Sequence, residues 1–402
     1  MRVGIMTDTY KPHVSGVTNF IDLNKRFLEA LGHDVFVFTF GDEEYIDDEP
    51  NIIRSPGMPL SSTGFYLNIR YTNQARKLLQ SMDIIHVQHP FISGGLAVLY
   101  CRPRGIPIVF TNHTRYDLYM QAYMPHLPDG IGETFLRPYM TNYCHTVDLV
   151  VAPSPGLKQV LQNLGVSVPI KVIPNGVDIA LFEKGVTPIE RASLGFDDTN
   201  LILLYSGRLG PEKNLPFLLR SFSGAVQAYD HLRFVVIGDG PERDNLEDRV
   251  RLMGIQDKVA FTGMIPYKMM PQYLKMADIF VTASVTEVHP LSVIEAMAAG
   301  LPVLGITSPG IGDTVEDGQN GFLAPDVDLA AFTAKMIRLA VDHELRGVMK
   351  KNAHQTALSY AIENTAQVML QEYERLVEEA VNRDPGKHLS IPEWLQKLIS
   401  YE

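Results

Sequence analysis

The sequence predicts two successive doubly wound α/β domains. Its 402 residues, 46% of them hydrophobic, are enough for two domains that each have a core of their own. Short apolar runs alternate with helix-length amphipathic segments from the N-terminus, and this alternation starts again near residue 200. Such βαβ units imply parallel sheets, and the cleft between two domains of this kind is the expected ligand site.

The first half opens with a βαβ unit. Residues 2–7 predict a strand and 17–31 a helix, which Gly32 ends before a second strand at 34–39. One face of this helix carries its apolar residues, which are Phe20, Leu23, Phe27, Leu28 and Leu31. Three further strands are expected at 84–87, 106–111 and 148–151.

The pattern restarts after the turn-rich segment 174–178. Strands are expected at 201–205, 233–237, 258–262, 278–281 and 302–304, and helices at 215–229, 241–253, 291–299 and 355–382. We therefore expect an N-terminal domain at 1–174, a C-terminal domain at 175–383, and a tail at 384–402 that packs back on the first domain.

Charge and composition exclude several classes of partner. A formal net charge of −11 argues against nucleic acid, because phosphate neutralisation needs a clustered excess of Lys and Arg. Cys101 and Cys144 are too few for a disulfide scaffold and lack zinc-ligand spacing. The start has no signal-peptide core, and no apolar run approaches the roughly 20 residues that span a bilayer. We expect a cytoplasmic protein that meets the inner face of a membrane only as a peripheral protein.

A short loop after the expected strand 201–205 carries two cations, Arg208 and Lys213. Open α/β sheets bind ligands at the carboxyl ends of their strands, and two cations suit a diphosphate. The loop has neither a Walker A sequence nor a Gly-x-Gly-x-x-Gly fingerprint. The competing interpretation is a solvated charge pair with Glu212.

The start of the helix expected at 291–299 offers an anion site. Pro290 or Leu291 suits the first helical position. The free backbone amides of Leu291, Ser292 and Val293 would then face an anion at this N-terminus.

Two carboxylates flank this helix start. Glu287 precedes the helix, and Glu295 lies a little over one turn inside it. Carboxylates accept hydrogen bonds from sugar hydroxyls, so the pair suits a sugar beside the anion. Taken singly, Glu287 is better explained as a helix cap and Glu295 as a solvated helical acid, and only the combination favours a site.

These motifs resemble the retaining glycosyltransferases of family 4. The resemblance rests on Glu287-x7-Glu295 leading into Glu-Ala-Met-Ala-Ala-Gly-x-Pro-Val, on Gly207-Arg208-x4-Lys213, and on the segment 173–178. It extends from the first strand to the segment 320–323. It implies the GT-B fold, in which two doubly wound Rossmann-like domains face each other across a deep cleft, and it requires no metal or other cofactor.

The resemblance implies roles for residues of the donor site. Arg208 and Lys213 would bind the diphosphate of a nucleotide sugar and stabilise its charge as it leaves. The backbone at Gly16 would approach the diphosphate from the first domain. Glu295 would hold the ribose and Glu287 the transferred sugar, beside the helix start at Pro290, Leu291 and Ser292.

His113 completes the expected catalytic set of His113, Arg208, Lys213 and Glu287. It follows a strand in Thr111-Asn112-His113-Thr114 and matches the family's active-site histidine, which reaches the donor sugar. The competing interpretation is a polar residue that ends a strand, and Gly16 could likewise be a simple turn. The resemblance implies retention of the anomeric configuration, by front-face attack within an ion pair.

Three segments depart from the family pattern or need care. Val288-His289-Pro290 replaces the more usual Gly-Phe-Gly, and Asp313 stands where the family often has Glu. Asp326-Val327-Asp328 spells the Asp-x-Asp of metal-dependent glycosyltransferases of another fold. We interpret it as a helix N-terminal cap, since Asp suits that position.

The expected acceptor side follows His113. Tyr116, Tyr119 and Tyr123 are spaced three and four apart and so share one helical face. The run resembles family members that glucosylate diacylglycerol or related lipids, while a tyrosine stripe packed on the core is the alternative. The segment 65–79 mixes aromatic residues with cations and has no acid, which suits an anionic lipid surface but also a solvated helix face.

We therefore expect transfer of a hexose from a nucleotide diphosphate sugar, UDP-glucose ahead of a GDP-sugar, to a membrane lipid such as diacylglycerol. The same chemistry on a soluble sugar phosphate or inositol phosphate, or with GDP-mannose, is the alternative within this class. A nucleotide-sugar epimerase and a non-catalytic nucleotide-sugar binding module are alternatives from other classes. Product analysis separates the epimerase, and donor turnover separates the binding module.

Overall fold

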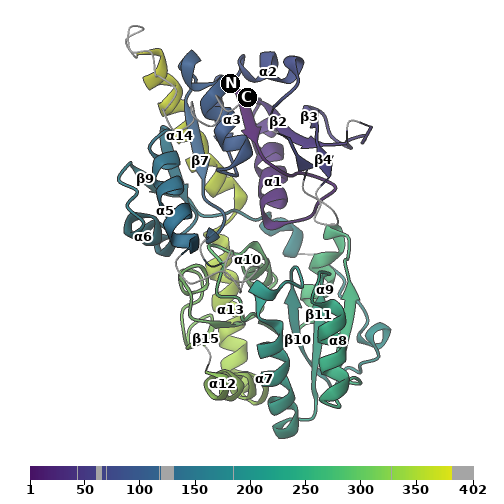
Figure 1. Ribbon diagram of the computed structural model, residues 1–402. Coiled ribbons are helices and arrows are strands. Elements are labelled where there is room, and N and C mark those ends of the chain that lie inside the picture. Colours follow the sequence, from purple (N-terminus) through teal and green to yellow (C-terminus); the bar gives the residue numbers. More distant parts are fainter. Residues whose placement is uncertain are drawn as a thin grey trace. The chain divides into compact units, whose positions relative to one another are not determined.

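The computed structural model describes residues 1–42, 44–59, 66–68, 70–116, 118, 131–183, 185–326 and 328–382, and Figure 1 shows their helices and strands. Contacts divide the chain into two compact units. Of the described residues, the first comprises 1–113, 131–176 and 362–382, and the second comprises 114–116, 118 and 177–361. Each unit is built on its own parallel sheet, as the sequence predicts.

The sheet of the first unit has seven parallel strands in the order β3-β2-β1-β6-β7-β8-β9. These strands are β1 Arg2–Met6, β2 Asp34–Gly41, β3 Ile52–Pro56, β6 Ile84–Val87, β7 Ile108–Thr111, β8 Leu149–Ala152 and β9 Ile170–Val172. The helices of this unit are α1 Gly16–Ala30, α2 Asn73–Leu79, α3 Ile92–Tyr100, η2 Arg102–Arg104, α5 Ile131–Cys144, α6 Pro155–Asn163 and α14 Ile362–Val381. β4 Met58–Pro59 and β5 Tyr66–Leu67 form a separate antiparallel pair.

Burial in the first sheet matches a sheet covered on both faces. Every residue of β6, β7 and β8 is buried, the polar His86 and Thr111 included, so burial along these strands is continuous rather than alternating. The strands that follow β1 in sequence, β2 and β3, extend the sheet on one side of β1, and β6 to β9 extend it on the other side. The order of the strands therefore reverses between β1 and β6, and their ends form the switch point of this sheet.

Helix α1 has clear start and stop signals. The Ser15 side chain accepts a hydrogen bond from the Thr18 amide, and the Thr18 side chain accepts one from the Ser15 amide, which forms a capping box. Gly32 follows the helix with a φ of +85°. Leu31, assigned to the apolar face, is 47% exposed because it is the C-cap residue and lies beyond the last turn.

The sheet of the second unit has six parallel strands in the order β12-β11-β10-β13-β14-β15. These strands are β10 Leu201–Ser206, β11 Leu232–Ile237, β12 Val259–Gly263, β13 Ile279–Val281, β14 Val303–Ile306 and β15 Gly321–Ala324. The main helices are α7 Leu215–Ala228, α8 Arg243–Leu252, α9 Met270–Met276, α10 Leu291–Ala298, α11 Pro309–Gly312, α12 Leu329–Val341 and α13 His343–Leu358. Single 3-10 turns are η3 Ile179–Phe182, η4 Arg191–Leu194, η5 Pro211–Lys213 and η6 Tyr267–Met269.

The helix expected over 355–382 is two helices. α13 ends at Leu358 and α14 begins at Ile362, and between them the Tyr360 carbonyl accepts a hydrogen bond from the Val177 amide at 2.9 Å. The Tyr360 ring also packs edge-on against His289, with centroids 4.8 Å apart. These contacts are distant in sequence, so helical periodicity gives no sign of the break.

Helix α14 packs within the first unit. Ile362 and Ala366 cluster with Leu23 of α1, and Tyr373 bonds to His86 of β6. The division at 1–174 and 175–383 placed this helix in the second domain, because a restart of the βαβ pattern does not say which sheet a late helix covers. The tail 384–402 lies outside the described residues.

None of the helices formed by the described residues is long and apolar enough to cross a membrane.

Candidate active site

The expected donor-site residues of the second unit gather where β10 and β13 end. Arg208 and Lys213 follow β10, and Glu287 follows β13. β10 and β13 are neighbours in the sheet, and the chain runs outward from them in opposite directions. This is the switch point of a doubly wound sheet, where such folds bind ligands.

Lys213 and Glu287 form an ion pair across this switch point. Lys213 Nζ lies 2.6 Å from Glu287 Oε1, and the two side chains are 21% and 19% exposed. Glu212, the alternative partner considered for these cations, is instead buried, and its Oε2 has no hydrogen-bond partner among the described residues. The structure thus brings a cation and a carboxylate of the expected site together from different loops.

Close backbone packing holds the Arg208 loop. The Tyr205 hydroxyl donates to the Arg208 carbonyl at 3.0 Å, and Arg208 itself is exposed. Gly238 lies against the carbonyl of Gly207, so a Cβ at position 238 would collide with that oxygen. Its φ of +130° also favours glycine. The loops after β10 and β11 can therefore lie against each other only with glycine at 238.

Helix α10 starts beside Glu287 as expected. Pro290 is its N-cap, and among the described residues no acceptor is bonded to the amides of Leu291 and Ser292. The Val293 amide, expected to be free, donates to the Pro290 carbonyl at 3.2 Å, because the first helical turn closes on its cap residue. Two free amides therefore face outward at this helix start.

The loop after β14 fixes the Glu287 segment. The Gly310 amide donates to the Glu287 carbonyl at 3.2 Å. A Cβ at Gly310 would lie 2.5 Å from that carbonyl oxygen, so the contact requires glycine. The departure at Asp313 falls just after this contact, in the residue that ends α11.

Glu295 is buried and hydrogen-bonded. Its Oε1 accepts from the Tyr267 hydroxyl at 2.8 Å, and the residue is only 5% exposed. Burial raises the pKa of the Glu295 carboxyl to about 7, while the bond from Tyr267 opposes the rise. The interpretation of Glu295 as a solvated helical acid is therefore wrong.

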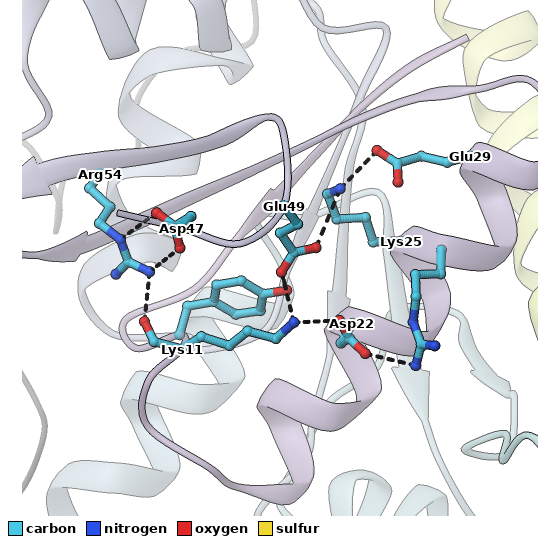
Figure 2. A network of polar contacts seen from close by, with 9 residues as sticks. Lys11, Asp22, Lys25, Glu29, Asp47, Glu49 and Arg54 are labelled. Atoms are coloured by element: carbon cyan, nitrogen blue, oxygen red, sulfur yellow. Dashed lines mark hydrogen bonds and ion pairs between the residues drawn. The ribbon is translucent and has the colours of Figure 1, made fainter. Parts of the chain in front are cut away.

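An ion-pair network anchors the loop that leads to Gly16 in the first unit (Figure 2). Lys11 Nζ lies 2.6 Å from Asp22 of α1 and 2.9 Å from Glu49. Arg54 donates to the Lys11 carbonyl at 2.6 Å. Gly16 is the exposed first residue of α1, and a Cβ there would meet open space. The network holds the loop before α1 in place, and at Gly16 no side chain blocks the approach of a ligand to the backbone.

His113 lies beyond the end of β7, at the same edge of the first sheet. Its Nε2 is 2.7 Å from Gln88 Oε1, and the Phe20 ring stands edge-on at a centroid distance of 4.8 Å. Burial lowers the pKa of His113 well below its usual value, and nearby His89 and His86 lower it further. The imidazole is therefore neutral near pH 7.

The expected acceptor residues are described only in part. Tyr116 is half-buried, while Tyr119 and Tyr123 lie outside the described residues. In the basic segment the cations Arg70, Arg76 and Lys77 are exposed. Arg76 lies over the Tyr100 ring, 5.8 Å from its centroid.

Asp328 confirms the helix-cap interpretation of the Asp-x-Asp segment. Its Oδ1 accepts a hydrogen bond from the Ala331 amide at 2.8 Å, at the start of α12. Within the described part of the chain, no group of three or more His, Cys, Asp or Glu side chains could hold a metal ion.

Sequence reasoning missed four residues that shape the two sites, namely Gln88, Gly238, Tyr267 and Gly310. Gln88 directly follows β6, Gly238 directly follows β11, and Gly310 lies shortly after β14. Their positions after buried strands were the signal available in the sequence. Tyr267 is the first residue of the 3-10 turn η6 and has no comparable signal.

Two doubly wound parallel sheets, the second with a cation, a carboxylate and a helix start at its switch point, define a GT-B glycosyltransferase. Comparison with protein families agrees with this class. Residues 14–181 match the family described as Glycosyltransferase Family 4, and residues 186–356 match Glycosyl transferases group 1. The chain belongs to the glycosyltransferase family that these two descriptions define.

Two similar curated proteins share one name. The chain is 34% identical over 342 residues to the alpha-monoglucosyldiacylglycerol synthase of Streptococcus pneumoniae, covering 80% of this chain and 75% of that protein. It is 28% identical over 383 residues to the alpha-monoglucosyldiacylglycerol synthase of Acholeplasma laidlawii, covering 90% and 94%. The chain is thus a glycosyltransferase related to these two synthases.

Solved structures share the fold over nearly the whole chain. Alr3699/HepE from Anabaena in complex with UDP-glucose superposes with a TM-score of 0.74 and 19% identity, covering 93% of this chain and 100% of that one. The sucrose-phosphate synthase of Thermosynechococcus elongatus superposes with a TM-score of 0.77 and 22% identity, covering 94% and 99%.

Proposed function

We propose that the protein transfers glucose from UDP-glucose to diacylglycerol at a membrane surface, with retention of the anomeric configuration. The Lys213–Glu287 pair at the switch point supports this most directly, because a cation, the kind of group that binds phosphate, lies beside a carboxylate, the kind of group that binds sugar hydroxyls. The 34% identity to an alpha-monoglucosyldiacylglycerol synthase supports the choice of acceptor.

The donor occupies the second unit in this proposal. Arg208, Lys213 and the amides of Leu291 and Ser292 bind the diphosphate, since cations and free helix amides both favour anions. Glu295 accepts hydrogen bonds from the ribose hydroxyls in its ionised form. UDP-glucose is the chosen donor because UDP and UDP-glucose occupy structurally similar proteins.

In the proposed reaction the bond between the sugar's anomeric carbon and the diphosphate oxygen breaks, and the acceptor hydroxyl oxygen bonds to that carbon on the same face. The proton of the hydroxyl passes to the departing diphosphate, so the products are UDP and a glucosyl lipid. Arg208 and Lys213 stabilise the charge that grows on the diphosphate. Glu287 holds the sugar. In the first unit, the backbone of Gly16 is assigned to the diphosphate and His113 to the sugar.

The acceptor binds along the chain that follows His113 in this proposal. Tyr116, Tyr119 and Tyr123 are its acceptor-side residues, of which Tyr119 and Tyr123 lie outside the described residues. The exposed cations Arg70, Arg76 and Lys77 of the first unit dock the protein on anionic lipid as a peripheral protein. Each such cation near an anionic surface contributes about 1 kcal/mol.

Transfer of radiolabel into lipid tests the proposal. Purified protein is incubated with labelled UDP-glucose, or separately with labelled GDP-mannose, and with liposomes of diacylglycerol and anionic lipid. We expect label from UDP-glucose in the organic phase, as an α-linked glucosyl diacylglycerol. The Lys213→Ala variant should lose this label, whereas Lys351→Ala, on the exposed part of α13, should keep it.

Other outcomes would redirect the proposal. Label that enters the lipid from GDP-mannose alone would show that the donor is GDP-mannose and not UDP-glucose. UDP release that a soluble sugar phosphate stimulates, with no label in the organic phase, would show that the acceptor is soluble and not a lipid. An epimerised nucleotide sugar, or donor binding without any turnover, would overturn the transferase itself. The three exposed cations are tested together in an Arg70→Gln, Arg76→Gln, Lys77→Gln variant. If this variant co-sediments with anionic liposomes as the wild type does, these cations do not dock the protein on the membrane.

A further inference from the structure

The side-chain amide of Gln88 has a defined orientation. Its Nε2 donates to the main-chain carbonyl of His86 at 3.4 Å, and its Oε1 lies 2.7 Å from His113 Nε2. The residue is 0% exposed, so water does not substitute for these partners. Turning the amide over would leave its oxygen against the His86 carbonyl, two acceptors facing each other.

This orientation decides which nitrogen of His113 carries the proton. An amide oxygen only accepts hydrogen bonds, so the 2.7 Å contact requires a proton on His113 Nε2. A neutral imidazole has one ring proton, and Nδ1 therefore keeps a lone pair. Of the described residues, none donates to this Nδ1, and His113 is partly exposed.

Two further histidines, His86 and His89, lie near His113. His86 of β6 bonds to the Thr111 hydroxyl at 2.7 Å through Nε2 and to the Tyr373 hydroxyl of α14 through Nδ1. His89 accepts a hydrogen bond from the Asp8 amide, 3.2 Å from its Nδ1. Burial lowers the pKa of both His86 and His89.

We propose that Gln88 is a positioning residue for the transfer reaction: it fixes His113 in the Nε2–H tautomer, so that Nδ1 accepts a hydrogen bond from a hydroxyl of the bound sugar or acceptor. This inference rests on the proposed function, which places His113 at the reacting sugar. His113 orients the hydroxyl without taking its proton, because a neutral imidazole in this buried setting is a weak base.

Nitrogen NMR of the full chain with labelled histidine tests the tautomer without any turnover. Protonated and unprotonated ring nitrogens resonate far apart, and the His113→Asn variant identifies the signal. We expect one neutral ring with the proton on Nε2, unchanged between pH 6 and pH 8. A proton on Nδ1, or on both nitrogens, in the wild-type protein overturns the inference even if lipid transfer is found.

Two substitutions of Gln88 test the consequence for the reaction. Gln88→Leu removes the acceptor, so His113 should populate both tautomers and kcat should fall about 10- to 100-fold, as for other partners that orient a functional histidine, with the donor KM little changed. Gln159→Leu, on the exposed face of α6, is the matched control with wild-type kinetics.

Gln88→Glu keeps the shape and accepts the same bond, but its negative charge raises the pKa of His113. Transfer should then be lost at low pH, where Nδ1 is protonated, and recover as the pH rises. A pH profile equal to that of the wild type overturns the inference. The Glu variant can be measured even if the Leu variant fails to fold. Absence of lipid transfer by the wild type, with the tautomer as expected, counts against the proposed function instead.

Discussion

Lys213 Nζ lies 2.6 Å from Glu287 Oε1, so the cation expected to bind the diphosphate is also the partner of the carboxylate expected to bind the sugar. When the donor binds, Lys213 has to serve both groups. Removing it takes away charge stabilisation of the leaving group and leaves Glu287 without this partner.

We expect Lys213→Ala and Glu287→Ala each to lower kcat by about 100- to 1000-fold, the range for loss of one group that stabilises a developing charge. The double variant should be much less impaired than the product of the two effects, because the residues act as a pair. Steady-state transfer rates measure this, with thermal unfolding as the check on folding. Wild-type turnover by a folded Lys213→Ala protein would contradict the donor-site assignment.

Glu295 should make donor affinity depend on pH. Burial raises the pKa of its carboxyl to about 7, and the ribose hydroxyls need the ionised form. Affinity for UDP-glucose, whose phosphates do not titrate near neutrality, should therefore rise about tenfold from pH 6 to pH 8. Calorimetric titration measures the affinity. Glu295→Gln should bind more weakly at pH 8 and show no such rise; a rise that persists in this variant would mean that another group titrates.

The same carboxyl makes stability depend on pH. Its pKa is higher in the folded than in the unfolded chain, where the value is near 4.5, so the folded state binds more protons between these two values. The free energy of unfolding contributed by Glu295 therefore falls as the pH rises from about 4.5 to about 7. Denaturant unfolding of the wild type and Glu295→Gln should converge at low pH and diverge above it, with the variant the more stable.

Gly310 and Gly312 offer a matched pair of substitutions within α11. A Cβ at 310 would lie 2.5 Å from the Glu287 carbonyl oxygen, whereas one at 312 would meet nothing within 4 Å. Gly310→Ala should displace the Glu287 segment and weaken donor binding, and Gly312→Ala should leave it unchanged. Calorimetric titration with UDP-glucose separates them. Equal affinities for the two variants would show that the contact does not hold Glu287 in place.

Tyr373→Phe should destabilise the first unit. The change removes the hydroxyl bonded to the buried Nδ1 of His86, and an unsatisfied buried polar group costs about 1–3 kcal/mol. Denaturant unfolding measures this loss. Tyr229→Phe is the control, since no hydrogen bond of that hydroxyl is present among the described residues. A free energy of unfolding equal to that of the wild type would show that His86 has another partner.

Periodicity predicted the parts of the fold that depend on local sequence. The strands at 201–205 and 233–237 correspond to β10 and β11 within a residue, because fully buried parallel strands are continuous apolar runs. The strands β3 and β9 were missed, since both contain polar residues and are only partly buried, so neither forms a continuous apolar run. The break before α14 is set by distant contacts of Tyr360, which no local signal reports.

The site was predictable where chemistry follows a strand directly. Lys213 and Glu287 lie in the segments that follow the neighbouring strands β10 and β13, and these segments were expected to meet at one edge of the sheet; the two side chains are in contact. That they bond to each other, and that Tyr267 bonds to Glu295, depends on side-chain directions that residue spacing does not fix. The role of Gln88 depends on an amide orientation, which is set by the three-dimensional position of the His86 carbonyl.

The placement of α14 bears on the order in which the protein is made. The ribosome delivers Val177–Ala361, the bulk of the second unit, before it delivers Ile362 and Tyr373, which complete the first. A nascent chain that ends at Ala361 therefore lacks the residues that pack on Leu23 and the hydroxyl that meets His86. The unit that begins the chain is therefore completed by residues that are synthesised after the bulk of the second unit.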